Sequence, residues 1–294
     1  MKNHVCKTVD DCRIHADVYP APELPAPVLV HIHGGCLMYG SRAGFRTEQV
    51  ALYNNAGYTV VSIDYRLAPE TKVPGIIEDP QDAFTWVRQE GAELFQADPD
   101  RIGVVGHSAG GYLALMSGIC VDPKPNALVA FYGYGDIIAE WYAEPDAFYC
   151  TKPPVSEDGS GIHLNGPACT APYDGRGTEQ LYLYCRQNGL WPEVVGGRDP
   201  KEDPGFFEPY CPERNVSSDY PPTLLLHGDK DTDVPYSQSV AMDAELTRHN
   251  VAHEFITIKD GSHGFDGNMD DAQVKAAFDK VLTFLNTHLS VHPE

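Results

Sequence analysis

The chain has 294 residues and a formal net charge of −21 at pH 7, and 42% of its residues are hydrophobic. This hydrophobic share is ordinary for a globular protein with a sizeable core, and so acidic a chain excludes nucleic acid as a favoured partner because phosphate backbones are negative too. The N-terminus does not have the pattern of a signal peptide and no stretch has the length of a transmembrane helix, so we expect a cytoplasmic protein without a membrane partner.

Short apolar runs alternate with stretches of helical periodicity along most of the chain. Residues 4–9 and 12–19 alternate in character around a pair of aspartates, which predicts an antiparallel hairpin. Buried strands are predicted over residues 28–33, 59–64, 101–107, 127–133, 221–228 and 253–258. Helices are predicted over residues 45–56, 78–95, 109–121, 237–249 and 270–289. This alternation predicts an α/β fold with a mostly parallel central sheet and helices on both faces.

The alternation stops over residues 134–220, which are rich in Gly, Pro, Tyr and acidic residues. A segment of this length is too long for a plain connecting loop in a compact domain. We therefore expect a core built from residues 1–133 and 221–294, with residues 134–220 inserted as a cap or lid.

The stretch GHSAGG (106–111) lies between a predicted strand and a predicted helix. Glycines two residues before and two after Ser108 have two interpretations. One is a tight turn in which Ser108 caps the helix. The other is a nucleophile elbow, which holds the serine hydroxyl exposed above the sheet.

Glycine-rich turns with polar side chains follow four of the predicted strands. They are HGG at 33–35, GHSAGG at 106–111, HGDKD at 227–231 and GSHG at 261–264. Open parallel sheets bind ligands at the carboxyl ends of their strands, so these turns are expected to meet at one edge. A serine, an aspartate and a histidine then come together, in that chain order.

The order Ser, Asp, His is that of α/β-hydrolases, and the chain resembles the esterase and lipase group of that fold. Within the group it is similar to the bacterial–fungal feruloyl-esterase-like and hormone-sensitive-lipase-like enzymes. The matching stretches are HIHGG, DYRLAPE (64–70), GHSAGG, HGDKDTDVPYSQS (227–239) and GSHGF (261–265). The resemblance implies the α/β-hydrolase fold and a serine esterase activity.

The resemblance also implies the catalytic groups. Ser108 would be the nucleophile that forms an acyl-enzyme, and His263 the base that takes its proton. The acid that orients the histidine would be Asp231, with Asp229 and Asp233 as rivals.

Backbone N–H groups near the nucleophile are needed to meet the negative oxygen of a tetrahedral intermediate. Ala109 supplies one at a helix N-terminus, and Gly34 and Gly35 are the other expected donors of this oxyanion hole. Cys36 stands where the family often has a third glycine, and either lines the substrate pocket or is a small buried thiol. His107, beside the nucleophile, either contacts substrate or packs in the core.

Aromatic residues are dense in the inserted segment. Trp141, Tyr142 and Trp191 are candidate substrate-binding residues that would line an acyl or aryl pocket. The alternative is a small core that holds the insertion together.

Charged residues of the DYRLAPE stretch and of the following helix are given structural roles. Arg66, with neighbouring carboxylates, is expected to brace the HGG loop from behind, so its mutation should lower stability and activity together. Glu78, Asp79 and Asp82 are expected in the first turn of a helix, where acids complement the dipole.

The function predicted from these motifs is a serine carboxylic-ester hydrolase for short-chain or aryl esters, without a cofactor or a metal. Its expected partner is a small-molecule ester. The sequence shows neither whether the protein forms a homodimer nor which ester is its natural substrate. The alternatives are a serine peptidase of the prolyl-oligopeptidase type and a non-catalytic binding protein with a hydrolase fold. A missing propeller domain counts against the first, and an intact Ser, Asp and His count against the second.

The chain has eight cysteines but no C-x-x-C pair, so a zinc ribbon is not expected. Free thiols are the expected state in a reducing cytosol. The sequence leaves undecided whether disulfides form among Cys150, Cys169, Cys185 and Cys211.

Overall fold

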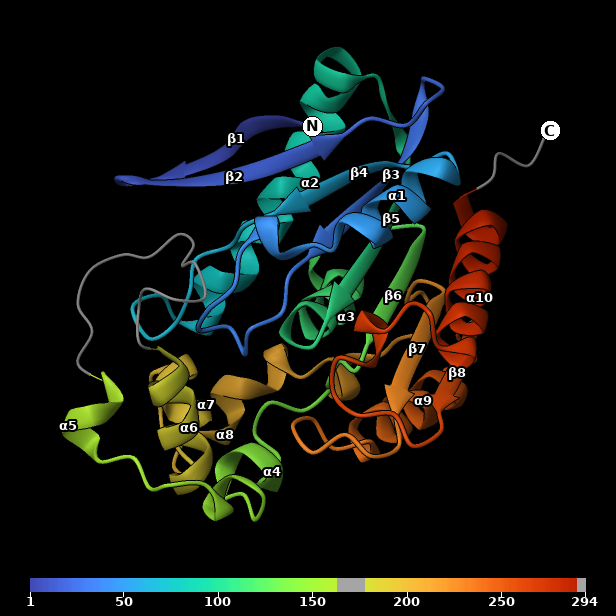
Figure 1. Cartoon of the computed structure of the whole chain (residues 1–294). Coiled ribbons are helices and arrows are strands. Elements are labelled where there is room, and N and C mark those ends of the chain that lie inside the picture. Colours follow the sequence, from blue (N-terminus) through green and yellow to red (C-terminus); the bar gives the residue numbers. More distant parts are fainter. Residues whose placement is uncertain (163–177, 290–294) are drawn as a thin grey trace.

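The structure is a computed structural model, and it describes residues 1–162 and 178–289. One eight-stranded sheet forms its centre, with the strand order β1-β2-β4-β3-β5-β6-β7-β8 (Figure 1). The strands are β1 (Lys2–Val9), β2 (Cys12–Tyr19), β3 (Ala26–Ile32), β4 (Thr59–Ile63), β5 (Ala97–His107), β6 (Ala127–Phe131), β7 (Thr223–Gly228) and β8 (His253–Ile258).

The pairing of the strands confirms the predicted sheet. β1 and β2 form the antiparallel hairpin, β2 pairs antiparallel with β4, and every other neighbouring pair is parallel. All residues of β4, β6 and β7 are buried, as expected of apolar strands that have helices on both sides. The parallel strands β3, β5 and β7 end at one edge, and the HGG, GHSAGG and HGDKD turns follow there.

Helices cover both faces of the sheet (Figure 1). Tyr53 and Phe278, from the first and last helices, belong to the apolar core of one face. Phe84, Leu113 and Met242 belong to the core of the other face. The helices of this framework are α1 (Thr47–Asn55), α2 (Val73–Phe95), α3 (Ala109–Cys120), α9 (Ser237–Arg248) and α10 (Ala272–Leu289).

Helix α2 begins at Val73, whereas the periodicity predicted a start at residue 78. Pro74 occupies the first turn, where proline is favoured because its missing N–H has no partner to lose. Pro80 was assigned that place from the sequence, but it lies inside the helix. Asp79 is consequently beyond the first turn, and its buried carboxylate binds cations instead of complementing the dipole.

The described part of the inserted segment consists of short helices and irregular chain. It packs on the sheet framework through aromatic rings: Trp191 is fully buried, and its indole Nε1 donates a hydrogen bond of 3.1 Å to the carbonyl of Cys36, just after β3. The helices are α4 (Glu140–Ala143), α5 (Glu157–Ser160), α6 (Thr178–Asn188), α7 (Trp191–Gly196) and α8 (Pro204–Phe207). They gather at one end of the molecule (Figure 1).

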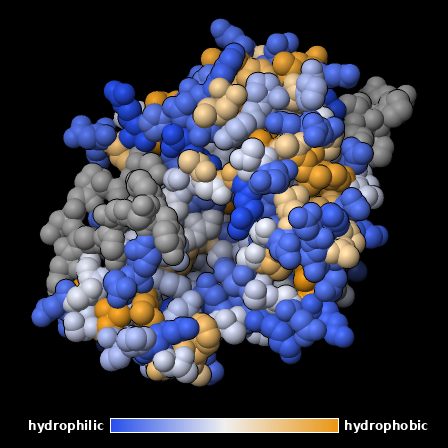
Figure 2. Space-filling model, viewed as in Figure 1, coloured by the Kyte–Doolittle hydropathy of each residue, from blue (hydrophilic) through white to orange (hydrophobic). Residues whose placement is uncertain are grey.

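Hydrophilic residues cover most of the face seen in Figure 2, and hydrophobic residues form only small separate patches there. No helix within residues 1–162 or 178–289 is both long and apolar enough to cross a membrane.

The thiols of Cys150, Cys185 and Cys211 are free. Cys12 is disulfide-bonded, which the sequence interpretation did not foresee. The expectation for Cys169 falls outside the described residues.

Candidate active site

Ser108 lies in a sharp turn between β5 and α3. Its backbone has φ 56° and ψ −119°, a conformation that a non-glycine residue adopts only under strain. A Cβ on Gly106 would lie 1.9 Å from the carbonyl oxygen of Gly110, and one on Gly110 would lie 2.0 Å from that of Ile32, so both positions require glycine. The Ser108 side chain makes no capping hydrogen bond to the helix. This geometry is that of a nucleophile elbow and not of a serine cap.

Asp231 and His263 come from the loops after β7 and β8 and are in direct contact. Nδ1 of His263 lies 2.7 Å from Oδ2 of Asp231, whose side chain is fully buried. The backbone N–H groups of Asp233 and Val234 donate to the other oxygen, Oδ1, and His227 Nε2 lies 3.3 Å from Oδ2. Burial alone would raise the pKa of Asp231, but the hydrogen bonds from His227 and His263 hold that pKa well below its ordinary value. Asp231 is therefore a fixed anion behind the imidazole.

The surroundings of His263 favour its protonated form. Burial by itself lowers the pKa of this imidazole, but the hydrogen bond with Asp231 and the charges of Asp233, Asp231 and Asp266 outweigh it. The pKa of His263 is therefore raised above the ordinary histidine value of 6.5.

The raised pKa predicts the acid limb of the pH profile. His263 can take a proton only when it is neutral, so kcat/KM should fall as the pH drops through a value above 6.5. Asp233→Asn removes one of the charges that raise this pKa, and should move the acid limb to lower pH. The measurement is kcat/KM for a neutral ester between pH 5 and 9 in both proteins. An acid limb that does not move would show that Asp233 does not act on His263.

Ser108 and His263 line the same cavity of about 250 Å³. The structure thus brings together the two residues that were predicted to exchange a proton, and places Asp231 behind the histidine. The other lining residues are Gly34, Gly35, Cys36, Tyr39, His107, Tyr132 and Asp233.

The loop after β3 places the predicted oxyanion donors beside Ser108. A Cβ on Gly34 would lie 3.3 Å from the Cβ of Ser108, so its backbone passes next to the serine. Gly35 has φ +107°, and a Cβ there would lie 2.1 Å from the carbonyl oxygen of Tyr39. The N–H groups of Gly34, Gly35 and Ala109 donate to no acceptor within the described chain, which suits donors that await a substrate oxygen.

The candidate substrate-binding residues divide into two groups. Cys36 and His107 line the cavity; Cys36 is buried, and burial raises the pKa of its thiol, whereas the His107 side chain is 12% exposed. Trp141, Tyr142 and Trp191 do not line it. Trp141 stacks on Tyr142 with ring centroids 3.5 Å apart, and Tyr142 stacks on Trp191 at 4.0 Å. These three rings form the small core that was the alternative interpretation.

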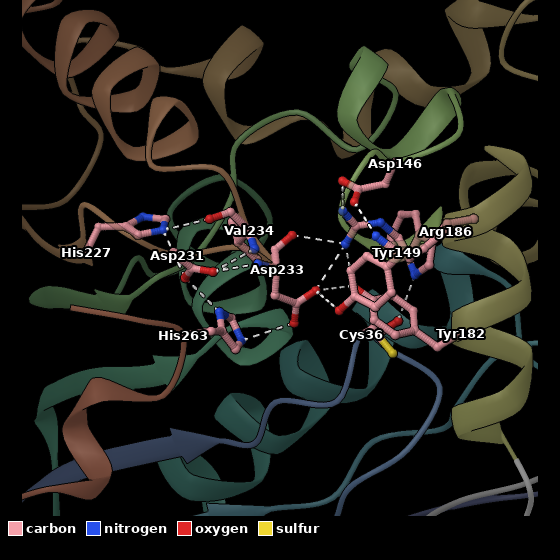
Figure 3. A network of polar contacts seen from close by, with 11 residues as sticks. Cys36, Asp146, Tyr149, Tyr182, Arg186, His227, Asp231, Asp233, Val234 and His263 are labelled. Atoms are coloured by element: carbon pink, nitrogen blue, oxygen red, sulfur yellow. Dashed lines mark hydrogen bonds and ion pairs between the residues drawn. The ribbon is translucent and has the colours of Figure 1, made fainter. Parts of the chain in front are cut away.

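Asp233 was considered only as a rival for the triad acid, but it has a separate place in the site. One of its oxygens, Oδ2, lies 3.4 Å from Nε2 of His263, on the side of the ring away from Asp231 (Figure 3). The other oxygen is bound by Arg186, Tyr149 and Tyr182 of the inserted segment. Sequence reasoning noticed the two tyrosines only as aromatic residues of the insertion, and it missed Arg186 because arginine is usually a surface residue.

Arg66 has a structural role, but it does not brace the HGG loop. Its guanidinium binds the buried carboxylate of Asp79 in α2 through Nε and Nη2, each at 2.8 Å. The group that reaches the loop is the hydroxyl of the neighbouring Tyr65, which donates a hydrogen bond of 3.0 Å to the carbonyl of His33.

Arg66→Ala should therefore lower the free energy of unfolding, whereas the geometry of the active site should change little. It leaves the fully buried carboxylate of Asp79 with Lys7 as its remaining cation, at a cost of about 3 kcal/mol. Urea unfolding measures the loss. The matched control is Arg198→Ala, because the exposed pair of Arg198 with Asp203 contributes less than about 1 kcal/mol. Equal losses in the two variants would contradict this role for Arg66.

Two family models match the chain in succession. Residues 17–140 match the BD-FAE model, and residues 180–292 match the prolyl oligopeptidase family. Together they include the predicted nucleophile, the acid and the histidine.

The chain is also similar to curated proteins and to solved structures. The chain is 30% identical to the non-reducing polyketide synthase stbA of Stachybotrys bisbyi over 90% of its own length, but spans only 14% of that protein. It is 27% identical to the esterase LipC of Mycobacterium tuberculosis, over 90% of the chain and 59% of LipC. An α/β-hydrolase superfamily protein from Enterococcus faecalis superposes with a TM-score of 0.74 at 24% identity, over 97% of this chain and 98% of that one.

Proposed function

We propose that this chain, which has the α/β-hydrolase fold, is a serine carboxylic-ester hydrolase with Ser108, His263 and Asp231 as its catalytic triad. The observation that carries the proposal is the cavity shared by a strained, uncapped serine and a histidine whose other nitrogen lies 2.7 Å from a buried carboxylate. The match to the BD-FAE model and the likeness to an esterase support ester substrates.

The reaction would proceed through an acyl-enzyme. Nε2 of His263 takes the proton of the Ser108 hydroxyl as its oxygen attacks the ester carbonyl carbon. The negative oxygen of the tetrahedral intermediate accepts hydrogen bonds from backbone N–H groups of Gly34, Gly35 and Ala109. His263 then returns the proton to the alcohol oxygen as the carbon–oxygen bond breaks. Water repeats the sequence on the acyl-enzyme, releasing the carboxylic acid and restoring the serine.

The cavity favours small acyl groups. At about 250 Å³ it lies below the usual range for pockets that take drug-sized ligands, so the space directly around Ser108 suits a short acyl chain. Tyr39 and Tyr132 supply aromatic walls, so short-chain or aryl esters fit the site best.

The test is hydrolysis of p-nitrophenyl esters from acetyl to palmitoyl, with fluorophosphonate labelling of Ser108 in parallel. We expect the highest kcat/KM for acetyl to butyryl esters, and labelling of Ser108. Labelling without ester cleavage would leave the nucleophile in place but refute the substrate class. Peptide substrates would then follow, in line with the prolyl oligopeptidase match over residues 180–292. Absence of both would refute the catalytic proposal.

A further inference from the structure

We propose that Asp233 selects esters whose alcohol portion carries a protonated or quaternary amine. The inference rests on the proposed esterase function and concerns which esters the site prefers. Asp233 lines the cavity with Ser108 and His263, and its side chain is 22% exposed.

The inserted segment holds this carboxylate by one oxygen. Oδ1 of Asp233 accepts hydrogen bonds from the hydroxyls of Tyr149 at 2.8 Å and Tyr182 at 2.5 Å, and from Nη1 of Arg186 at 3.0 Å. Nη2 of Arg186 binds Asp146 at 2.6 Å (Figure 3). The side chain of Arg186 is fully buried, with the rings of Trp141, Tyr142, Tyr149 and Tyr182 around its guanidinium. With three donors on Oδ1, the carboxylate is fixed and cannot turn away from the site.

The second oxygen is the one presented to the substrate. Oδ2 of Asp233 lies 3.4 Å from Nε2 of His263 and makes no other polar contact within the described chain. In the proposed reaction the same Nε2 protonates the leaving alcohol oxygen. A group that extends from this alcohol oxygen by two or three bonds therefore comes within reach of Oδ2. Asp233 thus faces the alcohol portion of the ester, not its acyl chain.

The charges around this position favour a cation. Asp231 and Asp233 contribute two negative charges beside His263, and Arg186 contributes one positive charge on the Oδ1 side of Asp233. Within the described chain, no lysine or arginine lines the cavity. Asp233 is the only carboxylate among the lining residues that the structure describes. The walls include Tyr39 and Tyr132, whose ring faces attract cations. An anionic alcohol group would be repelled at the same place.

The experiment compares esters of equal shape and different charge. 2-(Dimethylamino)ethyl butyrate and 3-methylbutyl butyrate form one pair, and butyrylcholine and 3,3-dimethylbutyl butyrate form the second. For wild type we expect kcat/KM to be about tenfold higher for the cationic member of each pair, with the preference falling as ionic strength rises. In Asp233→Asn the ratio should fall to about one. Butyrylcholine has no N–H, so a preference limited to the first pair would identify a hydrogen bond instead of charge as the cause.

Asp146→Asn is the matched control. Asp146 binds the other side of the same guanidinium and does not line the cavity, so the variant should keep the cationic preference of wild type. A wild-type ratio near one, or a ratio that Asp233→Asn leaves unchanged, would overturn the inference. If Asp233→Asn does not fold, the inference is tested by the wild-type ratio and its salt dependence, and a ratio that does not fall as ionic strength rises would contradict it.

A measurement without turnover separates this inference from the proposed function. Choline and 3,3-dimethylbutan-1-ol can be compared as protectants of Ser108 against fluorophosphonate labelling. Protection by choline at an about tenfold lower concentration supports the cation site even if no ester in the panel is cleaved. Equal protection by the two alcohols would refute the site, whatever the esterase result.

Discussion

Ser108→Ala is expected to lower kcat/KM for short-chain esters by about 10⁴-fold to 10⁶-fold. The reason is chemical, because the oxyanion donors and the histidine would remain but no nucleophile would form the acyl-enzyme. Stability should change little, since the hydroxyl makes no capping bond and alanine meets the same backbone strain at φ 56°. The variant should also resist fluorophosphonate labelling.

The measurement is kcat/KM for p-nitrophenyl butyrate together with the urea midpoint of each protein. Ser237→Ala is the control, because Ser237 is an exposed serine in the first turn of α9. It should keep wild-type activity. Residual activity of Ser108→Ala within about tenfold of wild type would show that another residue is the nucleophile.

Asp231→Asn is expected to lower kcat by about 10⁴-fold, because an amide at this position favours the wrong tautomer of His263. The fully buried Asp231 carboxylate lies 2.7 Å from His263 Nδ1, and this contact fixes which nitrogen carries the proton. The loss should be in kcat more than in KM, since the carboxylate lies behind the histidine and does not line the cavity.

The rival acid Asp229 gives the control. Its Oδ1 accepts a hydrogen bond of 2.7 Å from the backbone N–H of Asp260, and in the described part of the chain it makes no polar contact with His263, so Asp229→Asn should stay within about threefold of wild type. Single-turnover acylation in the two variants gives the comparison directly. A 10⁴-fold loss in Asp233→Asn with mild loss in Asp231→Asn would instead make Asp233 the third member of the triad.

The sequence predicted the sheet correctly, and it named three catalytic candidates that the structure brings close together, because both depend on local patterns. Buried parallel strands are continuous apolar runs, and the turns that follow them need glycine wherever one backbone crosses another closely. Gly110 shows this most clearly, since its position against the Ile32 carbonyl leaves no room for a side chain. The chain order of serine, aspartate and histidine then followed from the motifs alone.

The surroundings of Asp233 could not be predicted in this way. Arg186 lies 47 residues before Asp233, and Tyr149 lies 84 residues before it, so no local pattern joins them. The rings around the guanidinium make burial of an arginine favourable, which a residue-by-residue interpretation does not foresee. The aromatic residues of the insertion were noticed, but the sequence could not show which of them reach the cavity.

The indole of Trp191 binds the carbonyl of Cys36 across 155 residues of sequence. During synthesis the β3 strand and its loop leave the ribosome long before α7 does, so the loop must wait for this partner. Its backbone at Cys36 has φ 48°, a conformation that local preferences alone do not maintain. Replacing the inserted segment with one that lacks this tryptophan would therefore remove a hydrogen bond that holds the loop after β3 in place.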